Sequence, residues 1–178
     1  ACGLGHALYL VPDIEQAQLA FTTCWEHGTP MLGLGGMRLL MAADVERRLG
    51  NEAQAQQYFS WFEEELRRAT AEGYVIPAEQ GPDVTLHAML FAYLGREDQA
   101  LRQLVQIVTV DPFSAADLRR YPLFAELVKH PEFRAAEAQG RPRIERQRQD
   151  VLRLLCGPNP VSLKYRPLPT TCARLRTD

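Results

Sequence analysis

The chain has 178 residues, of which 46% are hydrophobic and 24% are charged, with a formal net charge of −2 at pH 7. These values are typical of an ordered globular protein, and a nearly neutral chain lacks the overall basic field that attracts nucleic acid or anionic membranes. No apolar run approaches the roughly 18 residues needed to cross a bilayer. We therefore expect this segment to bind neither nucleic acid nor membrane. The first residue, Ala1, indicates an excised domain or a processed product.

Residues 1 to 28 predict a first pair of helices, separated by a break at Pro12 and Asp13. Asp13 is a residue type that caps helix N-termini, because its carboxylate accepts a hydrogen bond from a free backbone N–H. Apolar residues recur at helical spacing on both sides of the break. The stripe before it consists of Leu4, Ala7, Leu8 and Val11, and the stripe after it includes Ala17, Leu19, Ala20, Phe21 and Cys24.

Two further helix pairs are predicted, the second over residues 37 to 72 and the third over residues 82 to 112. Pro82 can open a helix because its missing N–H would be unpaired there, and Gly95 supplies the left-handed residue that ends one. The aromatic side chains of the second pair and Trp25 of the first are interpreted as core rather than as a ligand cage. These aromatics of the second pair are Phe59, Trp61 and Phe62.

One turn sequence recurs between the helix pairs. Residues 49–55 of the second pair align with residues 94–100 of the third at an offset of 45, and residues 14–17 of the first pair form a weaker copy. Each copy carries a Gln-Ala dipeptide at the same point. A small residue there would let paired helices approach closely, and the repetition predicts one helical unit that occurs three times.

This pattern resembles the tetratricopeptide repeat, with glycine at the inter-helix turn, alanine five residues on, a bulky residue four further and proline at the end. The resemblance covers about two-thirds of the chain and is strongest in the third pair. It implies an all-α fold, a short α-solenoid of about three antiparallel helical hairpins. The third pair matches at Gly95, Ala100, Leu104 and Pro112, the second at Gly50, Ala55 and Phe59 with Arg67 in place of proline, and the first at Ala17 and Phe21.

After Pro112 the sequence predicts two short helices, each opened by a proline, Pro122 and Pro131. This ending resembles the short helices that follow the last repeat in bacterial signalling proteins, including membrane-anchored winged-helix transcription regulators, adenylate cyclases and serine/threonine kinases. Residues 143–155 predict a further amphipathic helix that caps the solenoid, with Ile144, Val151, Leu152 and Leu155 facing inward.

The last segment is rich in proline and is expected to lie extended over the surface. We therefore divide the chain into a repeat domain with capping helices, residues 1–155, and an extended tail, residues 156–178. Arginines are frequent from Arg141 to Arg176, and a charged helix face explains them better than a nucleic-acid site.

The four cysteines allow two disulfides. Cys2 and Cys24 each lie eleven residues from Asp13, so that a helical hairpin would bring them side by side, and Cys156 and Cys172 bracket the tail. Two disulfides would indicate an oxidising compartment, which favours an extracytoplasmic location over the cytoplasm. The competing interpretation is that the cysteines are small buried residues with free thiols.

A zinc site at Cys2, Cys24, His6 and His27 has suitable ligand types. However, the two histidines centre on a later residue of the hairpin than the two cysteines do, so we expect no metal and no other cofactor. The acidic run 63–65 is interpreted as a solvated helix face, because consecutive helical residues diverge by about 100°.

The sequence favours a non-catalytic domain that binds a protein or peptide, or senses a signal, within a larger bacterial regulator. It leaves the formation of a homo-oligomer open. The resemblance implies that the first helix of each repeat lines a concave groove. The alternative is a helical enzyme or small-molecule-binding domain with its site in the hollow, although no acid-base or nucleophile pair stands at readable spacing. The groove residues expected to contact a partner are His6, Tyr9, Asp44, Arg47, Arg48, Met89 and Tyr93.

Overall fold

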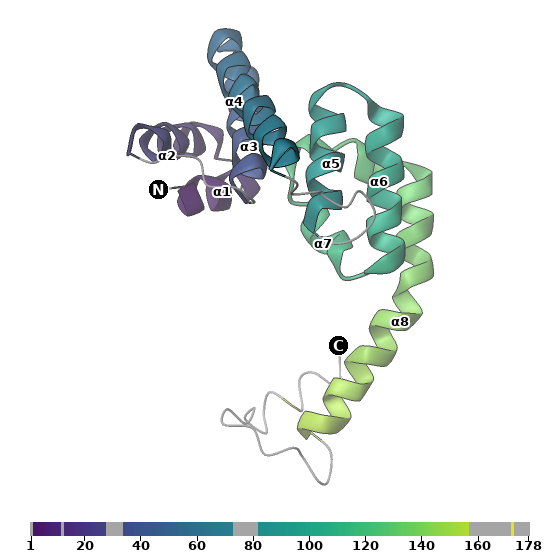
Figure 1. Ribbon diagram of the computed structural model, residues 1–178. Coiled ribbons are helices and arrows are strands. Elements are labelled where there is room, and N and C mark those ends of the chain that lie inside the picture. The colour runs from purple at the N-terminus through teal and green to yellow at the C-terminus, as the bar shows by residue number, and fades with distance from the viewer. Residues whose placement is uncertain (1, 12, 28–33, 73–81, 157–171, 173–178) are drawn as a thin grey trace.

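The computed structural model describes residues 2–11, 13–27, 34–72, 82–156 and 172. Over these residues the chain is all-α, as expected, and contains no strand. The first six helices are α1 (Cys2–Leu10), α2 (Ile14–His27), α3 (Leu34–Arg48), α4 (Glu52–Ala71), α5 (Pro82–Tyr93) and α6 (Glu97–Val110). They are followed by α7 (Ser114–Leu118), the 3₁₀ helices η1 (Pro122–Phe124) and η2 (Leu127–Lys129), and α8 (Pro131–Cys156) (Figure 1).

The turns after α3 and α5 have the same geometry. Gly50 and Gly95 adopt φ values of 80° and 69°, which residues with a Cβ rarely adopt. The N–H of Asn51 donates to the Glu46 carbonyl at 2.8 Å, and the N–H of Arg96 donates to the Phe91 carbonyl at 2.8 Å. Each glycine N–H donates to the carbonyl three residues before it. This is the Schellman ending of a helix, and it occurs twice at the 45-residue offset.

The first helix pair turns differently. The backbone N–H of Gln16 donates to Asp13 Oδ1 at 3.2 Å, which confirms the predicted cap of α2. Cys2 and Cys24 form a disulfide that ties α1 to α2, with their Cα atoms 5.0 Å apart. A second disulfide joins Cys156, at the end of α8, to Cys172. Both predicted pairings are therefore confirmed.

Consecutive helices pack in pairs, α1 with α2, α3 with α4 and α5 with α6. Helix α3 also contacts α1, α2 and α5, and every residue from Leu39 to Glu46 is buried. Ala55 and Ala100 are 1% and 0% exposed, as expected for the small residue of the repeated turn. Both are therefore core positions, one in α4 and one in α6.

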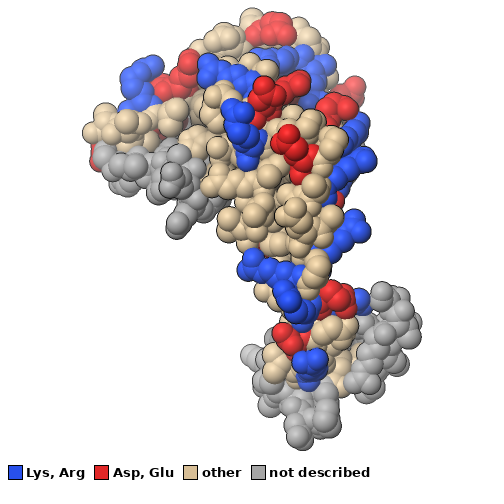
Figure 2. Space-filling model, turned by 90° about the vertical axis from the view of Figure 1, so that its right-hand side faces the viewer, with Lys and Arg blue, Asp and Glu red and all other residues tan. Residues whose placement is uncertain are grey.

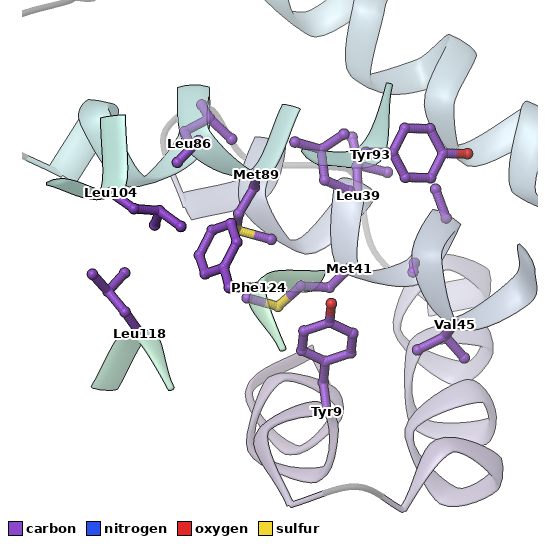
Figure 3. Packing of buried hydrophobic residues seen from close by; sticks show 14 of the residues in the cluster. Tyr9, Leu39, Met41, Val45, Leu86, Met89, Tyr93, Leu104, Leu118 and Phe124 are labelled. Atoms are coloured by element: carbon purple, nitrogen blue, oxygen red, sulfur yellow. The ribbon is translucent and has the colours of Figure 1, made fainter. Parts of the chain in front are cut away.

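The segment after α7 completes the core. Phe124 of η1 is fully buried, and its ring lies against Met89 of α5 and Met41 of α3, with Tyr9 of α1 beyond (Figure 3). Tyr121 contacts the same region, since its ring lies 6.5 Å from that of Tyr9. The chain thus places two of its own aromatic residues beside the first helices of all three pairs.

Helix α8 corrects the expectation of a separate capping helix over residues 143–155. One helix runs from Pro131 to Cys156 and continues through Pro142. Its first half packs against α6, while its second half leads away from the helix pairs (Figure 1). Val151, expected to face inward, is 51% exposed, and Leu154 is 55% exposed.

Two contacts explain why α8 continues through the proline. Gly140 is buried against Pro112, where a Cβ would lie 2.5 Å from the proline Cβ. One turn later, Arg143 Nη1 donates to the Val110 carbonyl at 3.0 Å. Packing on both sides of Pro142 therefore holds the helix where local sequence alone would end it.

Replacing Ala100 with leucine should lower the free energy of unfolding by about 1–3 kcal/mol, because the buried site leaves no room for added methyl groups. Denaturant unfolding measures this change. Ala135→Leu on the exposed face of α8 is the matched control and should leave stability nearly unchanged. Equal stabilities of the two variants would show that Ala100 is not at a close helix contact.

Replacing Gly140 with alanine should also destabilise the chain by about 1–3 kcal/mol, because the added Cβ meets the rigid Pro112 ring. Gly3→Ala in α1 is the control, since nothing lies within 4 Å of its Cβ position. Thermal unfolding of both variants tests the contact. A Gly140→Ala variant as stable as the parent chain would refute the close approach of α8 to Pro112.

Candidate functional site

A cleft of about 850 Å³ lies between α2 and α4. Its α2 wall is formed by residues spaced four, seven and eight apart, which one face of a helix presents together. These are Gln18, Thr22, Trp25 and Glu26. The α4 wall has the same spacing, with Gln54, Tyr58 and Trp61 on one face. Glu46 of α3 and the turn at Gly50 and Asn51 close one end.

Three aromatic rings form a continuous part of the lining. The Tyr58 ring lies edge-on to Trp61, with centroids 5.5 Å apart, and 6.4 Å from the Trp25 ring. Trp61 is 38% exposed, so its indole is accessible from solvent. The indole Nε1 of Trp25 is buried and has no hydrogen-bond partner among the described residues. An accessible aromatic surface of this kind is typical of binding sites.

The charged groups of the cleft are carboxylates. Glu26, Glu46 and Glu52 line it, and none of the described lining residues is lysine or arginine. Glu46 is 3% exposed, and its Oε2 accepts hydrogen bonds from Gln18 Nε2 at 2.9 Å and Asn51 Nδ2 at 2.8 Å. Burial raises the pKa of Tyr58, and the negative charges of Glu46 and Glu26 act in the same direction. The cleft therefore has a negative potential beside its aromatic wall.

The predicted groove residues lie elsewhere, and most of them are interior. Tyr9, Asp44, Met89 and Tyr93 are all buried. The Tyr9 hydroxyl donates to Asp44 Oδ2 at 2.8 Å. Burial raises the pKa of Tyr9 well above its usual value, and the Asp44 charge and hydrogen bond add to this effect. In this arrangement these four side chains contact the core rather than solvent.

Arg47 and Arg48 are exposed at the end of α3, and each has an internal partner. Arg48 Nε donates to Asp44 Oδ2 at 2.7 Å. Arg47 Nη1 donates to the Tyr93 carbonyl at 2.7 Å, and its guanidinium lies 3.7 Å from the centre of the Tyr93 ring. A contact of either arginine with a partner stays a prediction.

His6 of α1 lies beside Tyr121, the residue before η1. Its ring is 6.3 Å from the ring of Tyr121, and its buried Nε2 has no hydrogen-bond partner in the described part of the chain. Burial lowers the pKa of His6, and the charges of Arg38 and Arg120 lower it further.

The cysteine sulfurs of the zinc set considered above are joined in a disulfide, so they are not available as metal ligands. No group of three or more histidine, cysteine, aspartate or glutamate residues with metal-binding geometry occurs within the described ranges. Within the same ranges, no helix has both the length and the apolar character to span a bilayer.

Several surface charges outside the cleft form ion pairs. Arg67 and Arg68 pair with Glu64 and Glu65, which fits the predicted solvated face. On α8, Arg153 Nη1 lies 3.4 Å from Asp150 Oδ1. Basic and acidic residues are interspersed over the face that carries α6 and α8 (Figure 2).

The sequence interpretation missed the cleft because it assigned the aromatic residues to the core. Phe59 and Phe62 are indeed buried, but Trp61 is not. The signal that would have identified the site is the matching spacing of Gln18, Thr22 and Trp25 with Gln54, Tyr58 and Trp61 on consecutive helix pairs. Comparison with protein-family models, with curated proteins and with solved structures finds no match for this chain.

The pKa of His6 predicts a pH dependence of stability. Unfolded His6 takes up a proton near its ordinary pKa of 6.5, whereas folded His6 resists protonation until a lower pH. Acid therefore favours the unfolded chain, and this part of the stability is lost as the pH falls below about 6.5. His6→Gln should reduce the fall in melting temperature between pH 7.5 and pH 5.5. Identical pH profiles for parent and variant would contradict the shift.

Proposed function

We propose that this chain is a non-catalytic binding domain built as a short tetratricopeptide-like solenoid of antiparallel hairpins, and that it engages a protein or peptide partner. The repeated turn supports the repeat assignment, because Gly50 and Gly95 end their helices with the same hydrogen bonds and Ala55 and Ala100 are buried at matching positions. Three consecutive packed helix pairs are compatible with such a solenoid.

The observation that carries the binding function is the cleft between α2 and α4. It combines an exposed indole, two further aromatic rings and several polar side chains on rigid helices. Tryptophan and tyrosine dominate protein-binding surfaces because they bury large areas and still make polar contacts. In a solenoid, such a cleft between neighbouring repeats is accessible to an extended segment of a partner.

The alternative, a small-molecule or catalytic site in the hollow of the first helices, has less support. Phe124 and Tyr121 lie beside those helices and contribute to the core there. Space for a ligand at that position would require the segment around η1 to move. The cleft on the other side of α3 requires no such rearrangement.

We further propose that the domain belongs to a bacterial regulator, on the resemblance of the region after Pro112 to the endings of signalling repeat domains. The two disulfides support maturation in an oxidising compartment, which favours the extracytoplasmic side for this part of such a regulator.

Selection of peptides from a random display library on the intact, oxidised chain tests the proposal. Calorimetry on the selected peptides should show that Trp61→Ala lowers affinity at least about tenfold, as expected for an aromatic hot spot. Phe113→Ala removes an aromatic of 49% exposure outside the cleft and should have no effect. Failure to select any peptide, or equal loss in both variants, would refute this binding site.

A further inference from the structure

The cleft has a distinctive combination of charge and aromatic surface. Its three carboxylates have no basic residue among the described residues that line the cleft. A carboxylate with a nearby basic residue can form an ion pair, as Glu137 does with Arg119 at 2.6 Å. Three carboxylates in one cleft without a basic residue lower the free energy of a bound cation there.

Glu46 is the main source of this field. It is one of two buried carboxylates on α3, and the other, Asp44, accepts a hydrogen bond from the guanidinium of Arg48. The hydrogen-bond partners of Glu46 are the neutral amides of Gln18 and Asn51, and both donate to Oε2. A buried carboxylate with only neutral donors is costly, because the surrounding protein replaces water without supplying an opposite charge. A cationic ligand would supply that charge.

The aromatic wall favours the same class of ligand. The ring centroid of Tyr58 lies 6.4 Å from that of Trp25 and 5.5 Å from that of Trp61. Aromatic faces attract ammonium and guanidinium groups, and tryptophan does so most strongly. The long methylene stem of lysine or arginine would also cover part of the indole of Trp61.

One feature of the cleft favours an anion, but its charge is smaller than the combined charge of the three carboxylates. The first turn of α4, from Glu52 to Gln54, lines the cleft and presents the positive end of the helix dipole. That end is equivalent to roughly half an elementary charge. Glu52 lies in the same turn and opposes it, and Glu26 and Glu46 remain. The net field therefore favours a cation.

We propose that the cleft between α2 and α4 binds a lysine or arginine side chain of the peptide partner, with the cationic head near Glu46 and Glu26 and the stem against Trp61. This inference rests on the proposed function, because it names the partner chemistry of the same site. It predicts that peptides selected by this domain are basic.

The chain provides a selective probe, because it has only two tryptophans and both line the cleft. Titration of the ¹⁵N-labelled, oxidised chain with N-acetylarginine methylamide or N-acetyllysine methylamide should shift both indole N–H resonances. N-acetylcitrulline methylamide and N-acetylnorleucine methylamide are the neutral counterparts of similar size. They should bind at least about fivefold more weakly, which corresponds to the loss of a cation–π and carboxylate contact.

Two charge-neutral variants test the carboxylates. Glu46→Gln keeps an oxygen that accepts from Gln18 and Asn51, and Glu26→Gln changes an exposed residue, so the fold should tolerate both. Each should weaken binding of the arginine amide about two- to fivefold. Glu63→Gln on the opposite face of α4 removes the same charge and should not change affinity. Circular dichroism and melting curves confirm that each variant is folded.

The outcomes separate this inference from the proposed function. Equal binding of arginine and citrulline amides, or unchanged affinity in both cleft variants, would overturn the cation site. Selected peptides that bind at Trp61 without a basic residue would also overturn it, while the binding function would stand. If tetramethylammonium and the amino-acid amides bind but no peptide does, the cleft recognises small organic cations and both the peptide partner and the proposed function fail.

Discussion

The structure depends on the burial of α3 on all sides. Every residue of α3 from Leu39 to Glu46 is buried. A helix buried on every face is expected to be apolar all round. Yet Asp44 and Glu46 lie in this stretch, and each carboxylate had to acquire hydrogen-bond donors from a neighbouring helix pair. Asp44 accepts a hydrogen bond from Tyr9 of α1, and Glu46 accepts one from Gln18 of α2. The two acids therefore fix the position of α3 against the first pair.

Asp44 and Glu46 differ in how their negative charge is balanced. This difference distinguishes Asp44, which has a structural role, from Glu46, which belongs to the candidate binding site. Arg48 supplies a positive charge to Asp44 one turn along the same helix. Glu46 faces the opposite side of α3, where the neighbouring surfaces are amides and aromatic rings. A buried acid whose hydrogen-bond donors are neutral amides is costly without an opposite charge nearby, and this cost is the basis of the proposed cation site.

The sequence was sufficient to predict those helix ends and caps that neighbouring residues alone determine. Gly50 and Gly95 end helices because of their own backbone freedom, and Asp13 caps α2 through its own carboxylate. The Cys2–Cys24 pairing could be predicted because the two cysteines are equally far along the chain from the turn at Asp13. The continuation of α8 through Pro142 could not be predicted, because it depends on contacts with Val110 and Pro112, about thirty residues away.

The burial of most of the predicted groove residues could not be foreseen for a related reason. Repeat patterns indicate which helix comes first in each pair, but they do not show whether the concave side stays open. Here Phe124 is fully buried beside Met89 and Met41, and Tyr9 joins the same cluster. The segment around η1 packs beside α1, α3 and α5, and the repeat pattern before Pro112 does not indicate these contacts. The exposed indole of Trp61 lies instead in the cleft between α2 and α4.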